Sequence, residues 1–259
     1  LDGDVDVLGM AETATALGHC VADQLDAAMY LHTPRRTPTR AVYAGFQEGH
    51  SHATDHSLQP TDDEMFGHNR PLVIVDDEIS TGATALAAIE VLHEISSRPW
   101  YVVASLVDVR TPSHRAAAAR VERRLGTTIT FVSLAEGRVS HPDDLIDAVC
   151  ELDPPPLNRN RGRSRGHWQR LNLPWPRHIP DGGRHGILRR DRTRFTDAVD
   201  EAAASLGAHL DRRRPVLIVG HEELMYLPLR LGERLQQRGA DVRFQSTTRS
   251  PAYVCDQPG

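Results

Sequence analysis

The chain has 259 residues, of which 39% are hydrophobic, and a formal net charge of −5, so it is long enough for one large α/β domain or two modest ones. No apolar run approaches the roughly 18 to 20 residues that a membrane helix needs, and the first residues lack the basic start of a signal peptide, so we expect a cytoplasmic protein without membrane contact. Its three cysteines, Cys20, Cys150 and Cys255, lie far apart and predict neither a disulfide framework nor a Cys-x-x-Cys metal site.

Strand-like and helix-like segments alternate from the first residues onward. The pattern predicts strands at residues 4–9, 40–46, 71–77, 100–109 and 127–134, and helices at residues 11–29, 82–96 and 112–126. Short, nearly continuous apolar strands separated by helices are typical of a parallel sheet that helices cover on both faces. We therefore expect residues 1–153 to form an open, mostly parallel α/β sheet. Because the chain opens on Leu rather than Met and stops just after a strand, we also expect residues to be missing at both ends.

A linker and a second, smaller α/β domain follow in the prediction. Pro, Gly, Asn and Arg interrupt the alternation at residues 154–183, which indicates a linker. The domain expected at residues 184–259 contains a helix at about 192–210, a strand at 214–221, a helix at 222–239 and a strand at 240–248.

Charge is unevenly distributed along the chain. Residues 47–78 hold eight acids and one Arg, whereas residues 159–194 hold eleven Arg and two acids. All 30 basic residues are Arg, which excludes a Schiff-base lysine and a P-loop lysine. The Arg-rich stretch could track a nucleic-acid backbone, but only Trp168 and Trp175 accompany it as aromatic residues. We favour a solvated tether, or one folded against the acidic segment, and expect no nucleic-acid partner.

The segment at residues 72–86 carries the clearest chemical pattern. Four apolar residues are followed by Asp76, Asp77 and Glu78, and then by a turn that contains Ser80, Thr81, Gly82, Ala83 and Thr84. The turn precedes a predicted helix, where free backbone N–H groups and the helix dipole favour a phosphate. A hydroxyl-rich helix cap would explain Ser80 and Thr81 but not the paired acids. The pattern therefore indicates a ligand with a phosphate at one end and vicinal hydroxyls that donate to Asp76 and Asp77.

This stretch resembles the phosphoribosyl-diphosphate signature of type I phosphoribosyltransferases. The resemblance implies that Asp76 and Asp77 bind the ribose hydroxyls and act in catalysis, and that residues 80–84 hold the 5′-phosphate. It also implies Mg²⁺, held by Asp76 and Asp77 largely through the ligand, while a nitrogen nucleophile displaces diphosphate from C1 of the sugar. Glu78 stands where the family more often has an apolar residue.

Two earlier loops gain an expected role from the resemblance. Ala11, Glu12 and Thr13 follow the first strand, where such transferases bind diphosphate through backbone amides; Glu12 departs from the usual neutral turn and would engage Mg²⁺ or cap the helix. The loop at residues 46–60 contains His50, His52 and His56. We interpret it as a loop that closes over the substrates, with His50 or His52 as acid, base or diphosphate donor. A structural zinc site and a plain exposed hairpin are the alternatives.

The second half extends the resemblance to nearly the whole chain. Thr247, Thr248, Arg249 and Ser250 follow the last predicted strand and form a candidate anion site. The order of motifs resembles the phosphoribosyltransferase of bacterial tellurium-resistance-associated gene clusters, whose C-terminal module is named for Thr-Arg-Ser-Pro, here residues 248–251. That resemblance implies a pathway to a nucleoside-like metabolite.

The leading hypothesis is thus a phosphoribosyltransferase that acts on phosphoribosyl diphosphate and a nitrogenous acceptor, with a homodimer as one option for its assembly. One alternative is a non-catalytic regulatory protein that binds a phosphoribosyl ligand in the same site. A weaker alternative is hydrolysis of a phosphorylated sugar by a His-bound metal.

Overall fold

The computed structural model describes residues 4–34, 40–47, 55–62, 65–152, 168–211 and 213–247. Its helices and strands, in chain order, are β1 (Asp6–Gly9), α1 (Ala14–Gln24), β2 (Met29–His32), β3 (Ala44–Gln47), β4 (Asp55–Leu58), β5 (Leu72–Val75), β6 (Glu78–Ile79), α2 (Ala83–Ile95), β7 (Trp100–Asp108), α3 (Pro112–Leu125), β8 (Thr128–Glu136), α4 (Leu145–Cys150), η2 (Gly183–His185), β9 (Ile187–Leu188), η3 (Arg189–Asp191), α5 (Arg192–Gly207), β10 (Val216–Gly220), α6 (Tyr226–Gln237) and β11 (Val242–Ser246). None of the helices in these ranges is long and apolar enough to cross a membrane.

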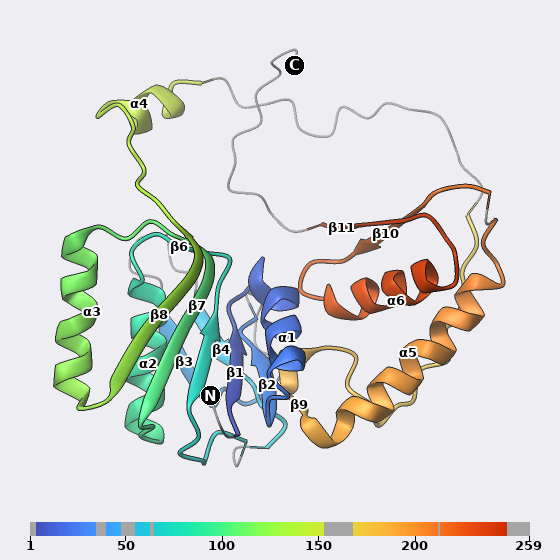
Figure 1. Cartoon of the computed structure of the whole chain (residues 1–259), viewed down its shortest axis with the longest axis horizontal. Coiled ribbons are helices and arrows are strands. Elements are labelled where there is room, and N and C mark those ends of the chain that lie inside the picture. Colours follow the sequence, from blue (N-terminus) through green and yellow to red (C-terminus); the bar gives the residue numbers. More distant parts are fainter. Residues whose placement is uncertain are drawn as a thin grey trace.

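A seven-stranded sheet forms the centre of the first domain (Figure 1). Its strands run in the order β6-β7-β5-β1-β2-β9, and β8 pairs with β7 on the other side. Every pairing is parallel except that of β9, which is antiparallel to β2. The predicted open, mostly parallel α/β fold is confirmed, and the carboxyl ends of β5, β1 and β2 lie next to one another.

Alternating side chains of the central strands divide the core into two layers. Leu8, Leu72 and Ile74 belong to the cluster that includes α2 side chains, whereas Val7 and Val73 belong to the cluster that includes α1 side chains. Each strand is apolar on both faces because helices cover both. This is why the sequence shows continuous apolar runs there rather than an alternation of apolar and polar residues.

Two parts of the first domain differ from the prediction. The helix expected at residues 11–29 ends at Gln24, and the chain turns and forms the fully buried strand β2, which was not predicted. The strand expected at residues 40–46 does not join the main sheet: β3 pairs antiparallel with β4 in a separate hairpin, in which Phe46 lies opposite His56.

The second module contains two parallel strands, β10 and β11, together with α5 and α6, as the sequence predicted. Its apolar cluster includes Phe195, Tyr226 and Leu231, but also Ile179 and Trp175 from the segment predicted as linker. The indole N–H of Trp175 donates to the Ile179 carbonyl at 3.0 Å. From Trp168 onward, that segment is therefore partly built into the module and is not simply a solvated tether.

The second module lies against α1 and β2 (Figure 1). The ring of His19 on α1 stacks between Tyr30 and Tyr226, with centroid distances of 4.4 and 3.5 Å. Arg230 of α6 forms an ion pair with Asp23 of α1 at 2.9 Å. Together with the pairing of β9 and β2, these contacts fix the module against α1 and the β2 side of the sheet.

Candidate functional site

Asp76 and Asp77 lie at the carboxyl end of β5, directly after four buried apolar residues. The Asp76 N–H donates to the Ala104 carbonyl of β7 at 2.9 Å, and the Asp77 carbonyl accepts from Leu106 N–H at 3.1 Å. These backbone bonds hold both acids at the end of the strand pair. Both residues are partly exposed, so their carboxylates sit at the edge of the sheet where open α/β folds bind ligands.

The turn after β6 leads directly into α2. Gly82, the residue before the helix, has φ of +80°, a left-handed conformation that glycine adopts without strain. The Thr81 hydroxyl accepts from Ala83 N–H at 3.1 Å. The first turn of α2 contains only uncharged residues, so its other N–H groups and the positive end of the helix dipole favour an anion there.

The loop after β1 lies beside these acids. Gly9 pairs with Val75, and the Met10 N–H donates to the Val75 carbonyl at 2.9 Å, so Ala11, Glu12 and Thr13 begin one strand away from Asp76. The Ala11–Glu12 peptide is cis. Ala11 is buried and Thr13 is exposed. The segments predicted to bind diphosphate and ribose phosphate are therefore neighbours.

Thr33 contacts this loop and His56 contacts Thr33, and the sequence did not indicate either role. The Ala11 N–H donates to the hydroxyl oxygen of fully buried Thr33 at 2.9 Å, and His56 Nδ1 lies 3.1 Å from the same hydroxyl. The His56 ring also stacks on Phe46. Thr33 follows a strand that has no sequence signature, so only the fold brings it to Ala11.

Other predicted site residues are only partly described. His50 and His52, and Thr248, Arg249 and Ser250, lie outside the described residues. Thr247 lies at the end of β11, next to the end of β10, where its hydroxyl accepts from Glu222 N–H at 3.2 Å and lies 3.0 Å from His221 Nδ1. Glu78 is exposed on the short strand β6.

A family model described as phosphoribosyl transferase matches residues 1–138, just over half of the chain. The chain belongs to this phosphoribosyl transferase family. A second model, described as the TRSP domain C-terminal to that transferase domain, matches residues 181–259 of the transferase. Among curated proteins, none matches the chain.

Solved structures similar to this transferase include three adenine phosphoribosyltransferases. The Rhodothermus marinus protein is 21% identical, with 52% of this chain and 71% of that chain covered and a TM-score of 0.34. The Trypanosoma brucei protein, in complex with AMP, pyrophosphate and ribose-5-phosphate, is 14% identical, with 57% and 70% covered and a TM-score of 0.38. The Saccharomyces cerevisiae protein is 16% identical, with 51% and 68% covered and a TM-score of 0.37.

Asp76 and Asp77 of this transferase have the right chemistry for a magnesium ion whose remaining ligands are phosphate oxygens and water. The described residues contain no group of three or more His, Cys, Asp or Glu side chains that could hold a metal. Asp76 and Asp77 supply two partly exposed carboxylates beside the predicted phosphate turn. Mg²⁺ typically binds through one or two carboxylates, water and substrate phosphates, which suits this arrangement.

Proposed function

We propose that the chain is a magnesium-dependent phosphoribosyltransferase that transfers the ribose 5-phosphate group of phosphoribosyl diphosphate to a nitrogenous acceptor and releases diphosphate. The observation that supports this most is the juxtaposition at the carboxyl edge of the sheet. Asp76 and Asp77 stand between the turn that opens α2 and the loop after β1. Phosphoribosyl diphosphate presents its groups in the same order: a phosphate, then the ribose hydroxyls, then the diphosphate.

Each segment has a distinct role in the proposal. The amides and hydroxyls of residues 80–84 bind the 5′-phosphate, and Asp76 and Asp77 accept hydrogen bonds from the ribose hydroxyls. As the bond from C1 to diphosphate weakens, positive charge develops on the sugar, and the nearby carboxylates stabilise it. Residues 11–13 bind the departing diphosphate through their backbone. When bound, Mg²⁺ would neutralise negative charge on the diphosphate.

Calorimetry with phosphoribosyl diphosphate and Mg²⁺ tests the ribose assignment. We compare the full chain with Asp77→Ala, with the isosteric Asp77→Asn, and with the control Asp143→Ala at an exposed position. Loss of charged hydrogen bonds worth about 1.5–3 kcal/mol should raise the Kd of Asp77→Ala about 10- to 140-fold. Equal affinity in wild type and Asp77→Ala would defeat the assignment.

Diphosphate release separates the enzyme from the non-catalytic alternative. Release that depends on an added heterocyclic base supports transfer, whereas tight binding without release for any base supports a regulatory role. The pathway to a nucleoside-like metabolite linked to tellurium resistance is also part of the proposal. It rests on the resemblance in motif order, and tellurite sensitivity of a deletion strain tests it.

A further inference from the structure

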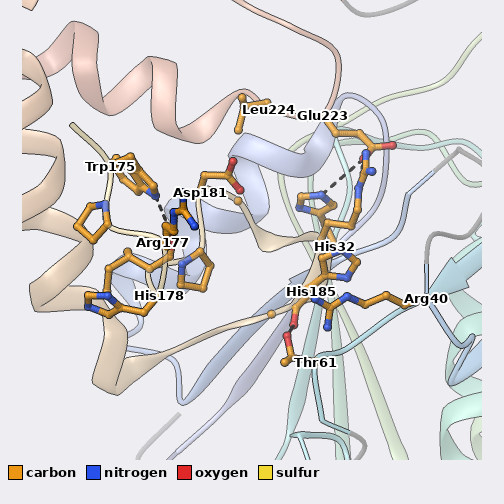
Figure 2. A pocket seen from close by; sticks show the side chains of 16 residues that line it. His32, Arg40, Thr61, Trp175, Arg177, His178, Asp181, His185, Glu223 and Leu224 are labelled. Carbon is orange, nitrogen blue, oxygen red and sulfur yellow. Dashed lines mark hydrogen bonds and ion pairs between the residues drawn. The ribbon is translucent and has the colours of Figure 1, made fainter. Parts of the chain in front are cut away.

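A cavity of about 640 Å³ lies between the end of β2 and the second module (Figure 2). Its walls come from the segment at residues 175–186, from the loop after β10 with Glu223 and Leu224, and from His32, Arg40 and Thr61 of the first domain. This volume is typical of small-molecule sites, which range from about 300 to 1,000 Å³. Most of its lining residues belong to the second module and to the segment that leads into that module.

His32 lines this cavity and has a buried ring nitrogen. The residue is 4% exposed, and within the described ranges its Nε2 atom has no hydrogen-bond partner. Burial, and then the charges of Arg184 and His185, lower the pKa of His32 to about 3, so its ring is neutral at neutral pH. Figure 2 shows the ring among the cavity residues, facing Glu223, whose carboxylate lies 3.9 Å from Nε2.

Two neighbours of His32 bear on which nitrogen carries its proton. The Tyr30 hydroxyl donates to the Thr15 carbonyl, so towards His32 Nδ1, 3.5 Å away, its oxygen can only accept. This contact favours hydrogen on Nδ1, whereas the Glu223 carboxylate, which is already paired with Arg184, favours hydrogen on Nε2. In the tautomer with hydrogen on Nδ1, His32 Nε2 is a buried acceptor for an N–H group of a ligand.

Glu223 connects the cavity to the proposed diphosphate loop. Its side chain is buried and accepts from Arg184 Nε at 3.1 Å, and its backbone carbonyl accepts from the Thr15 hydroxyl at 3.4 Å. Thr15 lies in the first turn of α1, just after residues 11–13. On the other side, the residue after His32 is Thr33, which accepts from Ala11. The cavity and the diphosphate loop are thus held by adjacent residues.

We propose that this cavity binds the nitrogenous acceptor as a planar heterocycle with an N–H group, and that the C-terminal module thereby determines acceptor specificity. The inference rests on the proposed function. The N–H donates to His32 Nε2, and Trp175 and Leu224 contribute apolar wall. Arg40 and Arg177 at the rim bind a carbonyl or carboxylate substituent. His32 is neutral and buried, so it discriminates by hydrogen bonding against rings that lack the N–H.

Ligand-observed NMR tests this site with five heterocycles that carry a ring N–H, namely adenine, hypoxanthine, uracil, orotate and imidazole, and with nicotinate, whose ring lacks an N–H, as the negative probe. Each probe is titrated into the full chain saturated with ribose 5-phosphate and Mg²⁺, which cannot transfer a phosphoribosyl group to the probe. His32→Leu removes the acceptor, and His209→Leu, at an exposed position just after the end of α5, is the matched control. At least one probe should bind, and its affinity should fall about tenfold in His32→Leu but not in His209→Leu.

Leu224→Trp is a second variant that fills the cavity from a partly exposed position, so it carries less risk to folding. It should abolish probe binding and raise the KM for the bound heterocycle, while the Kd for phosphoribosyl diphosphate stays at the wild-type value. If no probe binds, or if a probe binds wild type, His32→Leu and Leu224→Trp equally well, the cavity inference is wrong while the proposed function stands. Absence of phosphoribosyl diphosphate binding in the wild type overturns both.

Discussion

Replacing Thr33 with Val tests whether the loop after β1 depends on a single buried hydroxyl. Val keeps the shape of Thr but leaves the Ala11 N–H, now 2.9 Å from that hydroxyl, without an acceptor. A buried donor without a partner costs about 1–3 kcal/mol. The ligand-free loop can relax so that water satisfies this N–H, and binding must reverse the relaxation. Up to the full cost then appears as lost affinity, which raises the Kd for phosphoribosyl diphosphate about 5- to 140-fold.

The assay is calorimetry on wild type, Thr33→Val and the control Thr127→Val, combined with urea unfolding. The Thr127 hydroxyl donates to the Arg98 carbonyl at 2.7 Å, before the start of β8 and hence at the opposite end of the parallel sheet from the site. Both variants should lose stability, but only Thr33→Val should lose affinity. If Thr33→Val binds as tightly as wild type while its stability falls, the hydroxyl stabilises the fold and does not shape the loop.

Three further predictions concern stability. Arg98→Met removes one cationic partner of the Asp6 carboxylate from a fully buried ion pair, so the free energy of unfolding in urea should fall by about 3 kcal/mol. The control Arg243→Met, in an exposed ion pair, should change the free energy of unfolding by less than about 1 kcal/mol. The pKa of His32 is about 3 in the folded protein and 6.5 in the unfolded chain, so between these pH values only the unfolded chain binds the proton. The contribution of His32 to stability should be full above pH 6.5 and fall with acidification by up to about 1.4 kcal/mol per pH unit. In urea titrations, His32→Leu should reduce this slope. Gly82→Ala should destabilise by about 1–2 kcal/mol and weaken phosphoribosyl diphosphate binding, because φ is +80°; an unchanged urea midpoint would contradict this reasoning.

Sequence patterns predict the segment from β5 to α2 because its signals are local. Four apolar residues, paired acids and a glycine before a helix each constrain the backbone within a few residues. They do not predict β2, since Met29–His32 is short, buried on both faces and continuous with a helical pattern. Thr33 and Glu223 join the candidate site only through strand pairing and module docking. Such contacts between residues distant in sequence leave no periodic signal.

The pairing of β9 with β2 has a practical consequence for work on the first domain alone. β9 occupies one side of a strand whose residues are all buried, through pairing of Tyr30 with Ile187 and of Met29 with Leu188. A recombinant fragment that stopped at residue 152 would leave that side bare. Its unsatisfied amides and carbonyls could then recruit a strand from another copy. Self-association of such a truncated fragment would result from the loss of β9 at the side of β2 and would not indicate the natural assembly of the protein.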